Sequence, residues 1–311
     1  MWYNSTDRYK TEELGMKYSS VSEIAIKWEI TERAVRKYCA EGRVAGAILQ
    51  GKTWLIPENA VKPARKKRED ATPKTLLDIL VEEKNAKLHG GIYHKVQIEL
   101  TYNSNHIEGS RLTHDQTRYI YETNTIGVTD QTVRVDDIIE TANHFRCIDH
   151  IIDKANANIT ESLMKQLHFI LKNGTSDSRL DWFAVGDYKR LPNEVGGQET
   201  TPPEIVTSAI RELLDWYNAI EVKKFKDILE FHYRFECIHP FQDGNGRVGR
   251  LLLFKECLKN NIIPFVIDEQ LKLYYYRGLK EWKREPGFLT DTCYAAQDKF
   301  KAWLDYFRIQ Y

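Results

Sequence analysis

The chain has 311 residues, and its 45 Lys and Arg balance 45 Asp and Glu, so overall charge favours no class of partner. A hydrophobic content of 42% is enough for a real core in one large or two smaller domains. The five cysteines are scattered without a Cys-x-x-Cys pair, which argues against a disulfide framework and a zinc site. No apolar run reaches membrane-spanning length and no leader pattern occurs, so we expect a soluble cytoplasmic protein that does not contact membranes.

The first predicted elements are two short helices and a hairpin. Residues 21–28 place their apolar side chains on one helical face, and a second helix is expected over 32–41, with Thr31 as its N-cap. Apolar runs at 44–48 and 53–56 flank a turn, which predicts the hairpin. We therefore expect a small winged helix-turn-helix domain over residues 1–62.

This stretch resembles the winged helix-turn-helix of the excisionase and MerR type. The resemblance implies DNA contacts from Arg33, Arg36 and Lys37 on the second helix and from Lys52 in the wing. Residues 19–70 hold eleven Lys/Arg against seven Asp/Glu, a modest basic excess. A single copy would bind weakly, so a homodimer is predicted for a specific site. The alternative is a module that binds protein or packs on the rest of the chain.

The remainder of the chain is predicted to be mainly helical. Residues 63–73 are charged and bracketed by prolines, as is typical of a linker. Beyond them, a domain over 74–311 shows helical apolar spacing in most segments. The exception is 185–203, rich in Gly and Pro, which predicts a hairpin between helices or, alternatively, a long surface loop.

The most informative stretch is 239–250, His-Pro-Phe-Gln-Asp-Gly-Asn-Gly-Arg-Val-Gly-Arg, between two apolar helical patterns. Gly244 and Gly246 allow a sharp turn and a close approach of the backbone to a ligand. The following helix begins with unpaired N–H groups directed at the loop, which creates an anion site.

Four side chains in this loop have phosphate chemistry. Arg247 and Arg250 are three residues apart, so they are expected to share a helix face and clamp a polyphosphate. Asp243 is suited to Mg²⁺, and His239 to proton transfer with a pKa near 6.5. This combination predicts phosphoryl transfer, whereas the alternative is a glycine-rich interhelical turn with solvated charges.

The stretch resembles the signature of Fic-domain proteins at every fixed position. The resemblance implies transfer of AMP from ATP to a Ser, Thr or Tyr hydroxyl of a protein target, which includes the chain itself. His239 would be the general base, and Asp243 would hold Mg²⁺. The nucleotide phosphates would be bound by backbone N–H groups and side chains, namely those of Gly244, Asn245, Gly246, Arg247 and Arg250.

An upstream segment resembles the inhibitory motif of Fic proteins, in the class where it precedes the core. Ser104, Glu108 and Gly109 fit Ser/Thr-x-x-x-Glu-Gly/Asn. Glu108 is expected to form a bidentate ion pair with Arg250 and so block the γ-phosphate position. The resemblance also implies that this glutamate positions water to remove AMP. Alternatively, Glu108 is an ordinary helix-end carboxylate with Gly109 as the C-cap.

Two further segments carry family resemblance. Residues 185–203 resemble the Fic flap, which implies target-binding residues at Tyr188, Lys189, Arg190, Asn193 and Val195. The family usually has Gly-x-Tyr-Arg, and Gly-Asp-Tyr-Lys here leaves the role of Lys189 open. Tyr275 and Tyr276 match a helix start that lines the nucleotide pocket, although they also fit a core position. Where some relatives have an adenine-contacting Asn, this chain has Lys283.

Three hypotheses follow for function. The first is an AMP transferase with a DNA-binding module. The second is a transcription regulator whose Fic-like core only senses nucleotide, against which the intact His239 argues. The third is a related transferase that uses another donor or moves phosphate, but Asp243 and Arg250 favour ATP and AMP.

Overall fold

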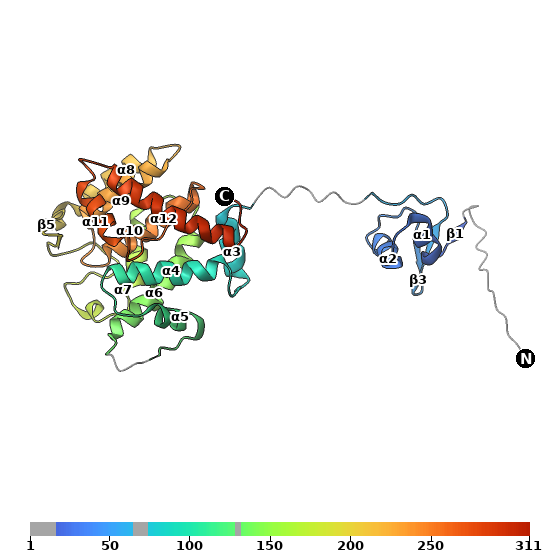
Figure 1. The fold of residues 1–311 in the computed structure, drawn as a ribbon, viewed down its shortest axis with the longest axis horizontal. Coiled ribbons are helices and arrows are strands. Elements are labelled where there is room, and N and C mark those ends of the chain that lie inside the picture. The colour runs from blue at the N-terminus through green and yellow to red at the C-terminus, as the bar shows by residue number, and fades with distance from the viewer. Residues whose placement is uncertain (1–16, 65–73, 128–131) are drawn as a thin grey trace, which may run out of the picture. The chain divides into compact units, whose positions relative to one another are not determined.

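The computed structural model describes residues 17–64, 74–127 and 132–311 (Figure 1). The chain divides into two compact units, Met1–Thr72 and Pro73–Tyr311. The linker predicted over 63–73 lies almost wholly outside the described residues. Among the helices in the described ranges, none is long and apolar enough to cross a membrane.

The N-terminal unit has two helices and a small antiparallel sheet of order β1-β3-β2. Its elements are β1 (Tyr18–Ser19), α1 (Val21–Trp28), α2 (Glu32–Ala40), β2 (Ile48–Gln50) and β3 (Thr53–Pro57). Ser20 and Thr31 cap the two helices through their side-chain oxygens, as their hydroxyls favour. The first strand was not expected from the sequence, because two residues show no alternation of polarity.

The C-terminal unit is a helical assembly. Its helices are α3 (Leu76–Asn85), α4 (Ile92–Ile107), α5 (His114–Thr123), α6 (Val135–Asp153), α7 (Glu161–Lys172), α8 (Val206–Asn218), α9 (Phe225–Ile238), α10 (Asn245–Lys259), α11 (Lys272–Glu281) and α12 (Gly287–Tyr306). Two short 3-10 turns occur at Asp177–Arg179 and Pro203–Ile205, and one hairpin pairs β4 (Glu194–Val195) with β5 (Gln198–Glu199). The predicted mainly helical fold with a short hairpin is confirmed.

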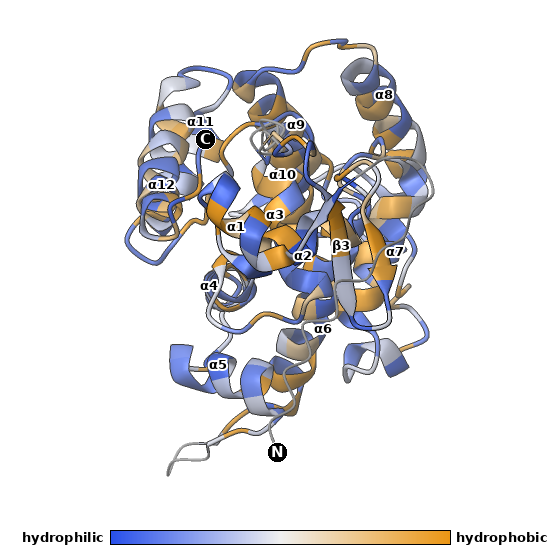
Figure 2. Ribbon diagram, turned by 90° about the vertical axis from the view of Figure 1, so that its right-hand side faces the viewer, coloured by the Kyte–Doolittle hydropathy of each residue, from blue (hydrophilic) through white to orange (hydrophobic). Residues whose placement is uncertain are grey.

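Helix α10 forms the centre of this unit. Thirteen of its 15 residues are buried, and it packs against α9, α6, α7 and α4. The helix lies in the interior although it also buries charged side chains such as Arg250 and Lys255, and Figure 2 shows hydrophobic colour on part of α10. This packing fixes α10, and with it the loop 239–244, against the neighbouring helices.

Candidate active site

The loop between α9 and α10 is built on two left-handed residues. His239 ends α9 at φ 52°, and Gly244 precedes α10 at φ 81°. A Cβ at Gly244 would lie 3.2 Å from the Leu171 side chain, so both conformation and space favour glycine there. The first turn of α10 therefore faces the loop, and its N–H groups can meet an anion.

Asn245 braces this loop instead of facing a ligand. Its side-chain oxygen accepts from the Phe241 N–H at 2.8 Å, and its amide donates to the Phe241 carbonyl at 2.8 Å. The residue is 1% exposed. Each end of the amide thus makes one hydrogen bond within the loop, and the second amide N–H is not used by these bonds, so a contact between Asn245 and phosphate stays a prediction.

His239 is half-buried beside the loop, and its Nδ1 lies 3.4 Å from the Glu236 carbonyl oxygen. That contact fits an Nδ1–H tautomer, which leaves Nε2 as a proton acceptor. Burial lowers the pKa of His239 to about 4. The expected value near 6.5 is therefore wrong, since the sequence does not reveal how far the imidazole is desolvated.

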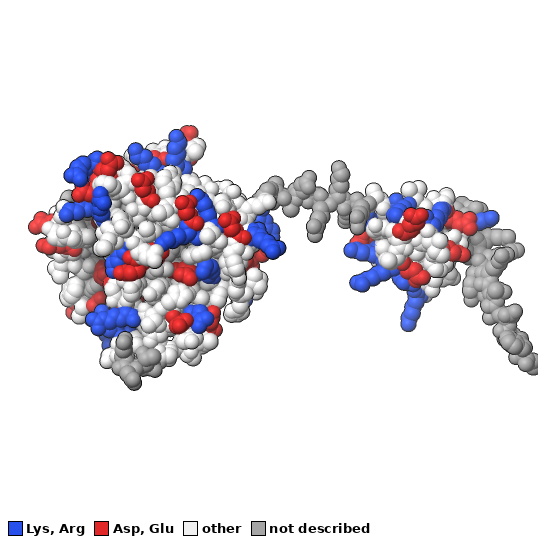
Figure 3. All heavy atoms as spheres, viewed as in Figure 1, with Lys and Arg blue, Asp and Glu red and all other residues white. Residues whose placement is uncertain are grey.

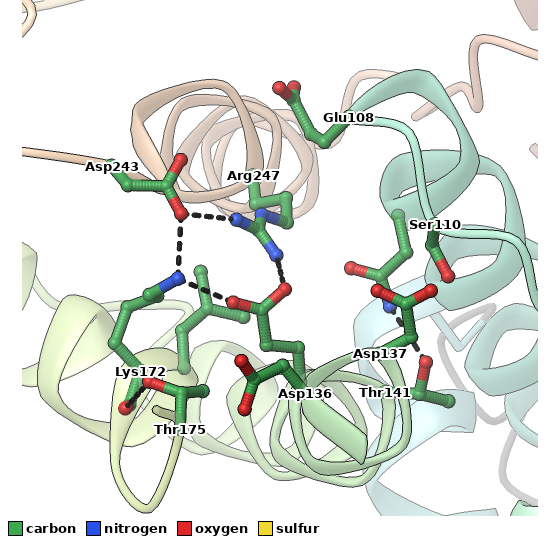
Figure 4. Close-up of polar contacts among 12 residues, drawn as sticks. Glu108, Ser110, Asp136, Asp137, Thr141, Lys172, Thr175, Asp243 and Arg247 are labelled. Atoms are coloured by element: carbon green, nitrogen blue, oxygen red, sulfur yellow. Dashed lines mark hydrogen bonds and ion pairs between the residues drawn. The ribbon is translucent and has the colours of Figure 1, made fainter. Parts of the chain in front are cut away.

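Asp243 is held by two cations. Its Oδ2 lies 2.6 Å from Lys172 Nζ and 3.1 Å from Arg247 Nη2 (Figure 4). Burial by itself raises the pKa of this carboxyl, but Arg247 and Lys172 hold it well below its ordinary range. The side chain remains 48% exposed, so it keeps a surface for a ligand.

The donor set around Asp243 fits Mg²⁺ bound together with a nucleotide. Within the described ranges, no three His, Cys, Asp or Glu side chains gather as a metal cluster. Mg²⁺ commonly uses one or two carboxylates and completes its coordination with water and substrate phosphates. A single half-exposed carboxylate at a helix N-terminus suits that mode, whereas a tightly bound structural metal would need more protein ligands.

Arg247 does not share a ligand-facing surface with Arg250. Its guanidinium pairs with Glu140 of α6 as well as with Asp243, and the side chain is 5% exposed. Glu140 was not anticipated, because nothing in the spacing of α6 connects it to residue 247. The predicted two-arginine clamp is therefore absent in this conformation, with each guanidinium directed at a different helix.

Arg250 is occupied by the segment that resembles the inhibitory motif. Its Nε donates to Ser104 Oγ at 3.0 Å, and its Nη2 donates to the Ser104 carbonyl and, at 2.6 Å, to Glu108 Oε1. The ion pair with Glu108 uses one oxygen, so the bidentate geometry expected from the sequence is not observed. Ser104 supplies the remaining contacts of the guanidinium.

The Glu108 carboxylate also lies against the start of α10. A Cβ at Gly246 would collide with Glu108 Oε1, so a side chain at 246 is incompatible with this arrangement. Gly109, with φ 93°, turns the chain directly after α4. A negative group thus sits at the helix N-terminus, where a phosphate would otherwise be favoured.

The two tyrosines divide between core and surface. Tyr275 is 1% exposed and its hydroxyl lies 2.6 Å from His232 Nε2, so the core alternative holds and its expected place in a nucleotide pocket is wrong. Tyr276 is 40% exposed near the end of α4. Close by, the Glu236 side chain is 13% exposed, and burial of its carboxyl raises its pKa to about 8. No motif or spacing in the sequence pointed to this acid.

The flap is anchored to the loop by residues expected to meet a target. The Lys189 N–H donates to the Pro240 carbonyl at 2.8 Å, and the Asn193 amide donates to the Phe241 carbonyl at 3.0 Å. Tyr188 is buried, with its hydroxyl donating to Glu161 at 3.0 Å. Target contact by these three side chains is therefore not supported.

Among these flap residues, Lys189 differs most from its expected role in target binding. The side chain is 3% exposed, and its ammonium donates to Asn193 Oδ1 and Thr200 Oγ1 within the flap. Burial lowers its pKa to about 8. Arg190 and Val195, by contrast, are exposed and remain available to a partner.

Two cavities lie near α9 and α10. One, of about 110 Å³, is strongly polar and is lined by residues that include Glu108, Asp243 and Arg247. The other, of about 540 Å³, lies along α9 and includes Cys237, Ile238 and Lys283 in its wall. Its lining residues include no member of the loop 239–244.

In the N-terminal unit, all four predicted DNA contacts are exposed. Arg36 pairs with Glu32 at 2.6 Å and Lys37 lies 3.8 Å from Glu41. No ion pair reaches Arg33 or Lys52 from any described residue. Figure 3 shows both signs of charge on the visible face of this unit, in keeping with its modest basic excess.

Comparison with known proteins shows which family the site resembles. Residues 158–256 match the Fic/DOC family, a range that includes α7 through most of α10. The protein adenylyltransferase Fic of Drosophila grimshawi is 28% identical over 184 residues, or 58% of this chain and 36% of that protein. The protein of the same name from Drosophila willistoni is 29% identical, with 58% and 35% covered. This chain thus spans about a third of the length of these relatives.

Solved structures agree. A Fic domain containing signaling protein from Bacteroides thetaiotaomicron is 26% identical with a TM-score of 0.55, covering 74% of this chain and 90% of that one. Fic-1 from C. elegans has a TM-score of 0.57 at 18% identity, covering 74% and 69%, and shows the same fold. The loop from His239 to Arg250 thus lies in a stretch that is similar to the Fic/DOC family in sequence and to solved Fic-domain proteins in fold.

Proposed function

We propose that this protein transfers AMP from ATP to a hydroxyl side chain of a protein target, itself included, and that Glu108 restrains the reaction. The observation that carries the proposal is the Glu108 carboxylate, which lies against Gly246 and Arg250 at the N-terminus of α10. This position favours an anion. A polyphosphate would require both the helix N-terminus and the Arg250 guanidinium.

In the proposed reaction, His239 Nε2 accepts the proton of the target hydroxyl as its oxygen attacks the α-phosphorus and pyrophosphate leaves. Backbone N–H groups at the start of α10 bind the α-phosphate oxygens. Arg250, once released from Glu108, binds the terminal phosphate. Asp243 would hold Mg²⁺, which would supply positive charge to offset the charge of the phosphates.

The flap would present Arg190 and Val195 to the target, since these are its exposed members. Removal of AMP by water is the reverse direction that the same site would support, with Glu108 as the residue that orients water.

The test compares wild type with Glu108→Gly, each incubated with Mg²⁺ and either α-labelled or γ-labelled ATP. We expect Glu108→Gly to raise protein labelling at least about tenfold from the α label alone, because loss of one buried-pair partner frees Arg250. His239→Ala added to this variant should abolish labelling while ATP binding persists. Labelling from the γ position would instead identify phosphate transfer, and no gain in Glu108→Gly would refute restraint by Glu108.

A second candidate function concerns the N-terminal unit, which we propose binds DNA as a homodimer. Exposed Arg33 and Lys52, which lack carboxylate partners among the described residues, support it. In the alternative overall role, the protein would be a nucleotide-sensing transcription regulator. AMP transfer by Glu108→Gly would show that the protein is an enzyme and would contradict a role limited to nucleotide sensing.

A further inference from the structure

Lys172, the last residue of α7, is a buried cation with no role in the proposed reaction so far. Its side chain is 2% exposed, and its ammonium lies within ion-pair distance of three carboxylates. These are Glu140 at 2.5 Å, Asp243 at 2.6 Å and Asp177 at 3.3 Å. Burial alone lowers the pKa of Lys172, yet Asp243 and Glu140 raise it above its ordinary value. The side chain is therefore a permanent positive charge.

Lys172 closes a ring of four charges. Asp243 pairs with Lys172 and Arg247, and Glu140 pairs with the same two cations, as Figure 4 shows. Two positive and two negative members make the ring neutral. Both ion pairs of Asp243 use Oδ2, and in Figure 4 its other oxygen points away from the ring.

The surroundings of the ring are acidic. Asp136, Asp137 and Asp177 line the same cavity of about 110 Å³ as Asp243, while Arg134 is the one additional cation in its wall. Without Lys172, the ring would carry a net negative charge beside these acids. Such a cavity would attract divalent cations whether or not a nucleotide were present.

We propose that Lys172 is a positioning residue that makes divalent-cation binding at Asp243 depend on the nucleotide. Its ammonium occupies Oδ2 and repels a second cation, so Asp243 alone binds Mg²⁺ weakly. Phosphates supply the missing ligands and negative charge when the nucleotide arrives. This proposal rests on the proposed ATP chemistry, but the effect of Lys172 on divalent-cation affinity can be measured without nucleotide.

The test titrates the full chain with Mn²⁺ as the probe, in the absence of nucleotide, and measures free Mn²⁺ by electron paramagnetic resonance. Lys172→Met should bind Mn²⁺ at least about tenfold more tightly than wild type, because one close positive charge is lost. Lys172→Arg, which keeps the charge, should match wild type. Equal Mn²⁺ affinity of Lys172→Met and wild type would overturn the proposal.

Further variants separate this role from a structural one. Lys255 is a second buried lysine. Its partners Glu256, at 2.7 Å, and the Ala155 carbonyl are not members of the ring. Lys255→Met should lower the melting temperature but leave Mn²⁺ affinity unchanged. Glu140→Gln removes a negative charge and leaves Lys172 with two carboxylates. It should therefore weaken Mn²⁺ binding, whereas Lys172→Met should strengthen it. A stronger affinity in Glu140→Gln would contradict the ring model even if Lys172→Met failed to fold.

A nucleotide arm isolates the proposed function. The inert analogue α,β-methylene-ATP should tighten Mn²⁺ binding in wild type more than in Lys172→Met, since only wild type depends on the phosphates. If the analogue bound neither wild type nor Lys172→Met, the proposed nucleotide site would be refuted. The comparison of the two proteins without nucleotide would still test the role of Lys172. Equal tightening in both proteins would refute the conditional role of Lys172.

Discussion

At the scale of single residues, burial decides how His239 can act. Its imidazole is desolvated by the packing of the loop, so its pKa falls to about 4. A general base must be unprotonated, and a lowered pKa keeps His239 in that form throughout the neutral range. The cost is a weaker driving force for accepting a proton, which precise placement beside the hydroxyl has to offset.

The lowered pKa of His239 predicts how the proposed AMP transfer depends on pH. In Glu108→Gly, single-turnover labelling should be constant from about pH 6 to 8 and fall only as pH approaches 4, since protonation then inactivates His239. The Glu108 carboxylate raises the pKa of His239, so its loss in Glu108→Gly should lower this pKa further. A pH–rate profile measured with saturating MgATP checks this. Half-maximal labelling near pH 6.5 would show that the imidazole titrates as in water.

At the scale of elements, α4 holds Arg250 through more than the inhibitory glutamate. Ser104 provides both a hydroxyl and a carbonyl acceptor one turn before Glu108. Three hydrogen bonds thus tie the guanidinium to the C-terminal end of α4. We therefore expect Ser104 to contribute, together with Glu108, to the proposed restraint on Arg250.

Ser104→Ala should therefore weaken inhibition without abolishing it. Loss of one hydrogen bond to a charged group is worth about 1.5–3 kcal/mol, part of the total that holds Arg250. Labelling from α-labelled ATP should lie between wild type and Glu108→Gly. Ser208→Ala, on exposed α8, serves as the control and should match wild type. Labelling in Ser104→Ala no higher than in Ser208→Ala would place the restraint on Glu108 alone.

At the scale of the whole molecule, two units with separate cores carry the two proposed activities. The N-terminal unit packs its own apolar cluster, which includes Ile24, Trp28 and Ile56. The C-terminal unit buries a far larger one around α10. Because neither core borrows residues from the other unit, the two activities should be separable by deletion.

Deletion of residues 1–73 from Glu108→Gly should preserve AMP transfer and abolish retention on DNA. In the full chain, Arg33→Ala with Lys52→Ala should weaken DNA binding and reduce its salt dependence, because two phosphate contacts are lost. Electrophoretic mobility shifts over a range of salt concentrations measure both. Lys301→Ala, on α12, removes one positive charge from the C-terminal unit and is the control for a charge lost outside the N-terminal unit. DNA retention by the deleted protein would move the DNA site to the C-terminal unit.

The sequence by itself determined the mainly helical fold and predicted the phosphate chemistry at 239–250. Helical apolar spacing and the glycines at 244 and 246 are local signals, since one helix or turn contains all the residues that produce them. The pairing of Glu108 with Arg250 was also anticipated, although it joins distant segments, because each belongs to a recognisable motif.

Only the tertiary structure decided the state of the site. Glu140 and Lys172 reach Asp243 and Arg247 from α6 and α7, and no spacing along the chain records that meeting. The inward turn of Lys189 and the burial of Tyr275 likewise depend on which elements cover them. Desolvation and ion pairing act through space, so they become readable only when the helices are packed together.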